Sequence, residues 1–257
     1  MDLTDTDTFR TATTRADLAL APGEHLLGGG TWLFSTPQPG VTGLVDLTTL
    51  DWSAVEDLAD GSLRIAGTCT VATLVAALAD DVHLGALVRS AAEAFLMSHK
   101  IQHTATVGGN LALALPAGAM ISLTAALDAT VVIWCPDGST RTEPVRTFVH
   151  GVERTSLAPG EVIRAVDVPA ASRTSRCVFR RTSLATYGRS SAVVIGRLTP
   201  AGPELTLTAS TTRPVVVGDA AELAGVDCWY ADPHGPADWR AAMTLRLARE
   251  VTEELVA

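Results

Sequence analysis

Apolar residues recur along this chain at two different spacings, which together predict a mixture of helices and strands. Apolar positions three and four residues apart are typical of helices that bury one face, and this spacing occurs over residues 71–79, 84–98, 117–127 and 237–256. Short runs of β-branched and other apolar residues predict strands over residues 25–27, 43–47, 63–67, 129–134, 139–143, 162–168, 176–181, 190–198 and 204–211. Because helices and strands interleave without a repeat, the pattern predicts an α+β fold.

The charge balance changes part-way along the chain and marks a candidate domain boundary. Residues 1–170 carry 9 basic and 19 acidic side chains, whereas residues 171–257 carry 10 basic and 9 acidic ones. Pro169-Ala170-Ala171-Ser172 lies at this change and has the composition of a linker. The sequence therefore predicts two domains, residues 1–170 and residues 171–257.

Composition narrows the class of protein. The 257 residues are 47% hydrophobic and 18% charged, which suits a folded globular chain. The formal net charge of −9 disfavours nucleic acid as a partner, because the phosphate backbone binds basic surfaces. No run of 18 apolar residues is present, and the acidic start of the chain does not resemble a signal peptide. We therefore expect a cytoplasmic protein that neither spans a membrane nor binds nucleic acid.

The cysteines and histidines give no sign of a metal centre. Cys69, Cys135, Cys177 and Cys228 are far apart in the sequence, whereas zinc and iron–sulfur sites use closely spaced ligands. We expect all four to be small apolar residues of the core. The six histidines lack the spacing of a ligand set, so no metal site is predicted.

Two glycine-rich segments carry the most chemical information. The first is Leu26-Leu27-Gly28-Gly29-Gly30-Thr31-Trp32-Leu33, and the second is a predicted loop, Ala105-Thr106-Val107-Gly108-Gly109-Asn110-Leu111. Consecutive glycines allow backbone N–H groups to converge on one point and bind an anion. Neither segment has the spacing of a Rossmann or P-loop motif. The residues alone leave two interpretations open, a pair of tight turns or two nests that hold a diphosphate from two sides.

In this order, the two segments resemble the flavin loops of the FAD-binding medium subunit of molybdenum hydroxylases, the family of xanthine dehydrogenase and carbon monoxide dehydrogenase flavoproteins. L-L-G-G-G-T-W-L (26–33) is similar to the first loop of that family, and A-T-V-G-G-N-L (105–111) is similar to the second. Further similar stretches follow in the family's order over residues 44–47, 63–67, 116–118, 126–129, 159–169 and 237–256. The resemblance therefore covers nearly the whole chain.

This resemblance implies a fold and a place for the cofactor. The fold would be the two-subdomain FAD-binding fold of the vanillyl-alcohol-oxidase-like type, with subdomains of about residues 1–55 and 56–170. Residues 171–257 would form a small α+β domain that resembles the C-terminal domain of carbon monoxide dehydrogenase flavoproteins. FAD would lie extended between the subdomains, and both glycine segments would hold its diphosphate.

The resemblance also implies cofactor contacts, position by position. Leu96 and Ile163 match apolar positions that touch the flavin or the adenine, and Arg180 matches a lysine position near the flavin ring, where a cation favours the anionic reduced form. The remaining implied contacts are Leu26, Leu27, Gly28, Gly29, Gly30, Thr31, Trp32, Leu33, Thr106, Val107, Gly108, Gly109 and Asn110. Tyr187 and His103 are the candidate catalytic acid–base groups near this site.

The chain departs from the family at several polar positions. Trp32, Leu113 and Leu115 stand where relatives carry polar residues, and Ala119 stands where they carry an aspartate that contacts the cofactor. Each lost hydrogen bond to a charged group weakens binding by about 1–3 kcal/mol. Either FAD is held differently here, or the apolar replacements shape a pocket for a nonpolar substrate, or the scaffold serves another purpose.

Three functions remain open from the sequence. The first is an FAD-dependent oxidoreductase component that passes electrons between molybdopterin and [2Fe–2S] partner subunits and NAD or oxygen. The second is a stand-alone FAD-dependent oxidase or dehydrogenase of a small organic substrate in a biosynthetic pathway. The third is a degenerate, flavin-free scaffold with a non-redox role.

Overall fold

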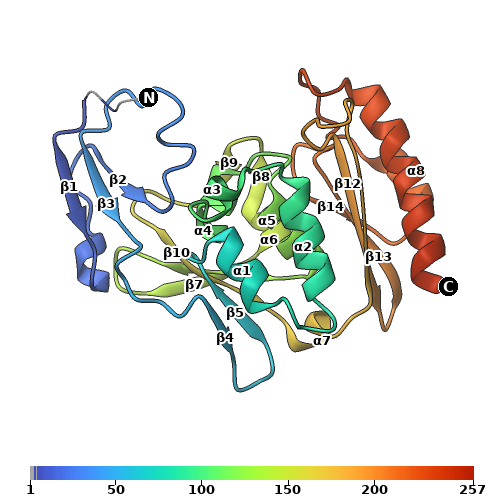
Figure 1. Cartoon of the computed structure of the whole chain (residues 1–257), viewed down its shortest axis with the longest axis horizontal. Helices are drawn as coiled ribbons and strands as arrows, with labels where there is room; N and C mark the ends of the chain where they lie inside the picture. The colour runs from blue at the N-terminus through green and yellow to red at the C-terminus, as the bar shows by residue number, and fades with distance from the viewer. Residues whose placement is uncertain (1–2, 4) are drawn as a thin grey trace.

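The computed structural model describes residue 3 and residues 5–257, which form three units that follow one another along the chain (Figure 1). The N-terminal unit, at the left of Figure 1, holds strands β1 (Thr8–Thr11), β2 (Glu24–Leu27) and β3 (Gly43–Asp46) and the 3-10 helix η1 (Arg15–Leu18). Its strands lie in the order β1-β3-β2, and both outer strands run parallel to β3. Because β2 ends at Leu27, this sheet positions the first glycine segment.

The middle unit is an antiparallel sheet with helices packed against it. Its strands lie in the order β4 (Val55–Asp57), β5 (Leu63–Ala66), β10 (Val162–Val168), β6 (Thr130–Trp134) and β7 (Thr140–Pro144). Its helices are α1 (Val71–Ala77), α2 (Gly85–Ala94), α3 (His99–Gln102), α4 (Val107–Leu113), α5 (Ala119–Ala126) and α6 (Val145–Phe148). A short ribbon of β8 (Val149–Gly151) and β9 (Arg154–Thr155) follows α6. The largest hydrophobic cluster of the described residues is centred in this unit and reaches Val193, Ile195 and Ala209 further along the chain.

The C-terminal unit is a second antiparallel sheet covered by one long helix. Helix α7 (Ala170–Arg173) leads into strands β11 (Cys177–Thr182), β12 (Ala192–Thr199), β13 (Gly202–Thr208) and β14 (Val215–Val217), which pair in chain order. The 3-10 helix η2 (Ala221–Gly225) and helix α8 (Ala237–Val256) follow. Helix α8, red in Figure 1, packs its apolar face on β12 and β11 and forms a separate core with them.

Helix α5 joins the middle unit to the C-terminal unit. All eight of its residues are buried, so it has no polar face toward water. It packs against α2 on one side and against β12 and β13 on the other. Ser122 of α5 shares a hydrogen bond of 2.6 Å with Thr208 of β13, and both hydroxyls are buried. The two units therefore share a continuous core rather than meeting across a polar linker.

The predicted α+β fold is confirmed, and four local predictions need correction. The loop predicted over residues 105–110 becomes helix α4 from Val107 onward. The helix predicted over 84–98 ends at Ala94, because Leu96 adopts a left-handed backbone with a φ of 53°. The linker at 169–172 is the start of helix α7, and Ser172 there is buried and accepts a hydrogen bond from Arg197. Among the cysteines only Cys69 is buried, and the other three are partly exposed.

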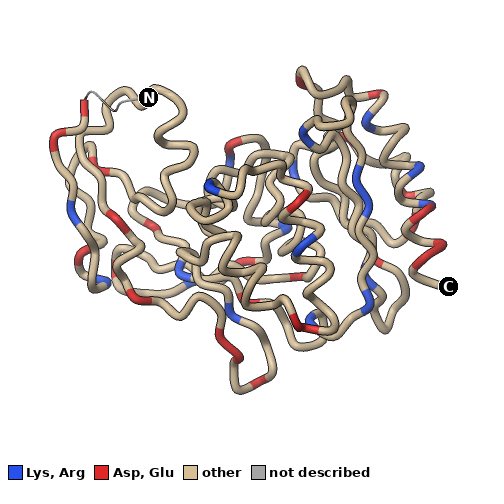
Figure 2. The backbone as a smooth tube through the Cα atoms, viewed as in Figure 1, with Lys and Arg blue, Asp and Glu red and all other residues tan. Residues whose placement is uncertain are grey.

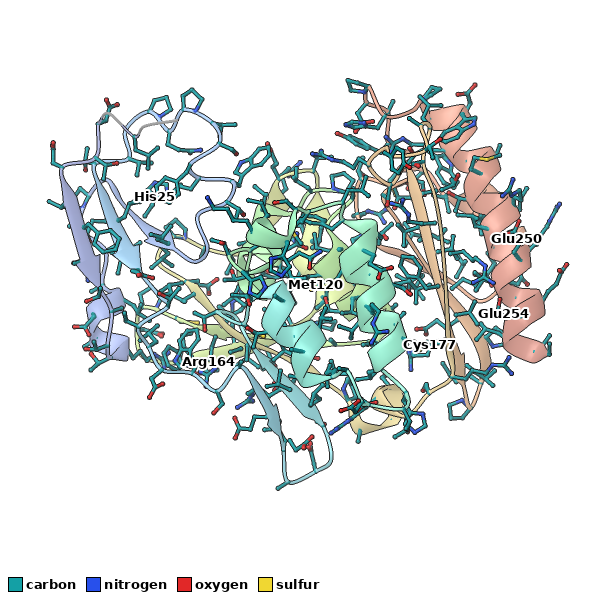
Figure 3. The ribbon with its side chains drawn as sticks, viewed as in Figure 1. His25, Met120, Arg164, Cys177, Glu250 and Glu254 are labelled. Carbon is teal, nitrogen blue, oxygen red and sulfur yellow. The ribbon has the colours of Figure 1, made fainter. Side chains whose placement is uncertain are left out.

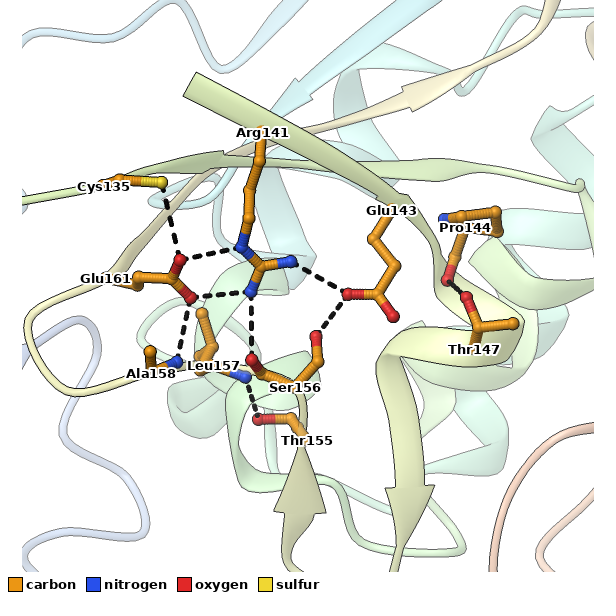
Figure 4. A network of polar contacts seen from close by, with 10 residues as sticks. All are labelled: Cys135, Arg141, Glu143, Pro144, Thr147, Thr155, Ser156, Leu157, Ala158 and Glu161. Carbon is orange, nitrogen blue, oxygen red and sulfur yellow. Dashed lines mark hydrogen bonds and ion pairs between the residues drawn. The ribbon is translucent and has the colours of Figure 1, made fainter. Parts of the chain in front are cut away.

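An ion pair fastens the edge strand β7 to the turn before β10 (Figure 4). The Arg141 guanidinium donates to both carboxylate oxygens of Glu161, from Nε to Oε1 at 2.7 Å and from Nη2 to Oε2 at 2.6 Å. The backbone N–H of Ala158 and the thiol of Cys135 also donate to this carboxylate. The Arg141 hydrogen bonds are the main reason that the pKa of Glu161 falls to about 2.

Replacing Glu161 with glutamine is expected to lower the free energy of unfolding at pH 7 by about 1–3 kcal/mol, the usual size for a hydrogen bond to a charged group. Because folding lowers this pKa to about 2, the carboxylate stabilises the fold above the ordinary glutamate pKa of about 4.3. That contribution is lost as the pH falls toward 2. Urea unfolding of both proteins between pH 7 and pH 4 measures the difference, which should shrink below about pH 5. The matched control is Glu250→Gln in an exposed pair on α8, and an equal loss in both variants would contradict the assignment.

Candidate functional site

A cavity of about 710 Å³ lies where the three units meet. Its volume is within the range of about 300–1,000 Å³ that is usual for ligand pockets. The first glycine segment lines one part of it, and residues 95–97, α4 and the turn at 112–117 line the middle. The C-terminal unit contributes Arg189, Ser190, Ala209, Tyr230, Asp232 and Arg240. A ligand in this cavity would therefore touch all three units of the chain.

The first glycine segment presents unpaired backbone donors at the end of β2. Within the described residues, the N–H groups of Gly29, Gly30 and Thr31 donate no hydrogen bond. Glycine is required here for two reasons. A Cβ at Gly29 would lie 1.7 Å from the carbonyl oxygen of Thr104, and Gly30 has a φ of +67°. The backbone is thus pressed against residue 104, and three consecutive amides have no acceptor within the described residues, so they are available to an anion.

The second glycine segment does not form the predicted nest. Its N–H groups are already used, since Val107 donates to Cys69 O at 2.9 Å and Gly108 donates to Gly67 O at 2.8 Å. The N–H of Gly109 donates to the Thr106 hydroxyl, which caps helix α4. Gly108 instead permits close packing, because a Cβ there would lie 2.7 Å from Gly67 O.

The second segment contributes a side-chain donor and an exposed glycine to the cavity. Gly109 is exposed toward the cavity, and Asn110 lines it beside Thr106. The Asn110 side-chain oxygen accepts from the N–H of Met120 at 3.0 Å, which leaves its NH₂ group as a donor for a ligand. The cavity therefore has backbone donors on one wall and an amide donor on the facing wall.

Neither glycine segment contains a charged residue of its own, and Asp46 lies beside Leu27 in the sheet. The chain carries no Asp, Glu, Lys or Arg between Glu24 and Asp46, and none between Lys100 and Asp128. Figure 2 draws these stretches, one in the N-terminal unit and one in the middle unit, as uncharged tan tube.

The charged groups of the cavity come from the C-terminal unit. Arg240 is 1% exposed and donates to the carbonyl oxygens of Gly235, Ser191 and Ala209, and it pairs with Asp232. Its guanidinium also stacks 5.2 Å from the ring centroid of Tyr230. Arg189, in contrast, is exposed and forms no ion pair or hydrogen bond with any described residue. Arg189 is thus a cation that remains available to a ligand at the edge of the cavity. Arg240 instead supports the cavity lining through its hydrogen bonds to the backbone.

Most of the implied cofactor contacts meet in the cavity. Leu26, Leu27, Trp32 and Leu33 line it with the glycines and threonine between them, and Leu96, Thr106, Gly109 and Asn110 line the facing side. Two substituted positions, Leu113 and Leu115, also line it and make its middle apolar. Ala119 lies outside it, 5% exposed in the first turn of α5.

Six of the residues that the family resemblance implies as cofactor contacts or that are candidate catalytic groups do not line the cavity. Val107 and Gly108 are buried behind the α4 surface, and Ile163 packs into the core beneath the middle sheet. Arg180 points to α8 and pairs with Glu254, so the cations at the cavity are Arg189 and Arg240, not Arg180. Tyr187 is 91% exposed on the β11–β12 loop, and the His103 ring contacts His99. Arg189, Tyr230, Asp232 and Arg240 line the cavity without having been predicted as site residues, whereas Leu113 and Leu115 were already candidate pocket residues.

These features suit an extended, anion-bearing molecule such as a dinucleotide, because unpaired backbone amides and apolar side chains line the same cavity. The family described as the FAD-binding domain in molybdopterin dehydrogenase matches residues 9–171. The chain belongs to this family, and its cofactor is FAD. The first glycine segment fits the diphosphate of FAD, because the amides of residues 29–31 are unpaired and a Cβ at Gly29 or Gly30 would collide with neighbouring atoms. The Asn110 NH₂ group adds a further donor.

Solved structures share the fold over almost the whole chain. Quinoline 2-oxidoreductase from Pseudomonas putida 86 matches with a TM-score of 0.82 and 21% identity, covering 99% of this chain and 98% of that chain. Reconstituted CO dehydrogenase from Oligotropha carboxidovorans matches with a TM-score of 0.82 and 22% identity, covering 99% of both chains. CO dehydrogenase from Hydrogenophaga pseudoflava matches with a TM-score of 0.81 and 18% identity, covering 97% of this chain and 98% of that chain. Among curated protein sequences, none matches this chain.

Two further findings concern membranes and metals. No helix of residues 3 and 5–257 is both long and apolar enough to cross a bilayer. In the same part of the chain, no three histidine, cysteine, aspartate or glutamate side chains are grouped as metal ligands would be.

Proposed function

We propose that this protein is the FAD-carrying component of an oxidoreductase, passing electrons between molybdopterin and [2Fe–2S] partner subunits and NAD or oxygen. Its membership of the family of FAD-binding domains in molybdopterin dehydrogenases carries the proposal. The structural likeness to two CO dehydrogenases and a quinoline oxidoreductase over nearly the full chain supports it. In the proposed complex the partner subunits hold the molybdenum and iron–sulfur centres.

The chain's own residues would bind the cofactor and control its surroundings. Bound FAD supplies the capacity to take up and release electrons. The amides of residues 29–31 and the Asn110 NH₂ group hold negative charge at one end of the cavity. Leu113 and Leu115 exclude water from the middle. Arg189 offers a positive charge at the rim, where an anionic acceptor would approach.

Two structural proposals accompany this function. We propose a domain boundary near residue 170, which the end of β10 at Val168 and the end of the family match at residue 171 support. We also propose that the protein acts in the cytoplasm. The four free cysteines support this location, since reduced thiols are normal in a reducing compartment.

The visible spectrum of the purified chain tests the proposal. We expect flavin absorption bands, release of FAD on denaturation, and loss of the oxidised bands on anaerobic reduction with dithionite. Mixing the reduced protein with NAD or with oxygen should then restore the oxidised bands with the true acceptor. A chain that is purified without flavin and takes up no added FAD would refute the proposal.

The apolar middle of the cavity favours a second candidate function. Because Leu113, Leu115 and Trp32 replace polar residues of the family, the cavity wall suits a nonpolar substrate of a stand-alone FAD-dependent oxidase or dehydrogenase. In that case, small apolar alcohols or amines would reduce the flavin of the isolated chain without any partner subunit. Reduction only by a co-purifying subunit favours the first function.

A further inference from the structure

Two histidines lie side by side on the surface of helix α3, outside the group of residues that line the cavity. The Nε2 atoms of His99 and His103 are 3.1 Å apart. Their ring centroids are 4.4 Å apart, and the ring planes are inclined by 52°. Both side chains are exposed. The two Nε2 atoms are thus within hydrogen-bond distance of each other, and both rings are open to solvent.

The backbone holds this pair in place. Residues four apart lie on one face of a helix, whereas Lys100, next to His99, faces elsewhere. Ser98 caps the turn by accepting from the N–H of Ile101, and the N–H of His103 donates to His99 O at 3.3 Å. The Gln102 side chain donates back to Met97 O. The one-turn helix is thus tied at its start and along its length, and the two imidazoles meet without rearrangement.

The separation of the two nitrogens suits a shared metal ion. Zinc binds histidine nitrogen at about 2.0–2.1 Å, so two imidazoles on one ion have nitrogens roughly 2.9 Å apart at a right angle and roughly 3.4 Å apart at a tetrahedral angle. The observed 3.1 Å falls between these limits. Neutral imidazole is a preferred ligand of zinc, nickel and copper.

We propose that His99 and His103 form a surface site for one late first-row divalent metal ion, bound through both Nε2 atoms, with water in the remaining positions. The expected order of affinity is copper above nickel and zinc, as for nitrogen ligands in general. The site is independent of FAD, because neither histidine lines the cavity. Ile101, between them, does line it, so the site lies beside the cavity without forming part of it.

Calorimetric titration of the untagged, FAD-loaded protein with nickel chloride, and separately with zinc sulfate, tests the proposal. We expect one bound ion per chain, and binding about tenfold weaker or more in His99→Ala and in His103→Ala, because the second ligand then no longer adds to the first. The matched control is His83→Ala, an exposed histidine whose side chain forms no hydrogen bond with a described residue, and it should bind as the parent does.

The outcomes separate this site from the proposed function. Absence of binding to the parent protein, or unchanged binding by the double variant His99→Ala/His103→Ala, overturns the site. Because both side chains are exposed, the variants should keep the FAD content and circular dichroism of the parent. Repeating the titration on flavin-free protein gives the same result if the site is correct, so a failure of the FAD assignment would leave this test intact.

Discussion

Replacing Gly109 with glutamate is expected to lower the affinity for FAD at least a hundredfold while the chain stays folded. Gly109 lies in the first turn of α4, where its backbone is helical, so a side chain is tolerated by the backbone. Its Cβ would need only the Thr106 hydroxyl to shift, and it would project into the cavity. There the carboxylate would occupy cofactor space and repel the diphosphate. A hundredfold loss is about 2.7 kcal/mol, within what a nearby like charge costs at a partly buried site.

Flavin content after gel filtration and fluorescence titration with FAD measure this effect. The matched control is Gly225→Glu, which adds the same charge at an exposed glycine with no heavy atom within 4 Å of the added Cβ. It should bind FAD as the parent protein does. A Gly109→Glu protein with full flavin content would show that the cofactor takes another path through the cavity.

Replacing Arg240 with methionine is expected to destabilise the fold by about 3–5 kcal/mol, the usual result of removing one partner from a buried ion pair. Arg240 is 1% exposed and satisfies three backbone carbonyls as well as Asp232. Methionine fills part of the volume and leaves these acceptors without a donor. The carbonyls belong to residues 191, 209 and 235, so the same substitution should loosen the cavity wall and weaken FAD binding.

Urea unfolding of apo and FAD-loaded protein measures both consequences. Arg246→Met is the control on the same helix, since Arg246 is 63% exposed and pairs only with Glu250. Exposed pairs of this kind contribute about 0.3–0.5 kcal/mol. Equal destabilisation by the two substitutions would mean that Arg240 is not part of the supporting wall.

The first glycine segment was predictable because its chemistry is local. Three consecutive glycines after an apolar strand leave the backbone free to present amides, and the sequence shows both features. The second segment was predicted as a loop instead of a helix, because Gly-Gly is unfavourable in a helix by about 1 kcal/mol per glycine relative to alanine. The contact of Gly108 with Gly67 explains the choice, and this contact joins positions 41 residues apart that no local pattern connects.

The contacts of the arginines also could not be predicted from a local sequence pattern. Arg180 and Arg189 lie in one acid-free stretch, and their order in the sequence does not tell which of them faces the cavity. Strand β11 directs Arg180 to Glu254 near the end of the chain, whereas the loop before β12 carries Arg189 to the rim. The role of Arg240 also could not be predicted from the sequence, because it depends on three carbonyl groups that only the folded C-terminal unit brings together.

The burial of helix α5 has a consequence for how the cofactor enters and leaves. Swinging the C-terminal unit away would expose an all-buried helix and break the bond between Ser122 and Thr208. Each apolar side chain drawn into water there costs about 1.5–3 kcal/mol, so domain opening is too costly to serve as a route. Met120 of this helix, labelled in Figure 3, lies in the interior of the middle unit and is 1% exposed. The shared core therefore disfavours opening of the cavity by a swing of the C-terminal unit.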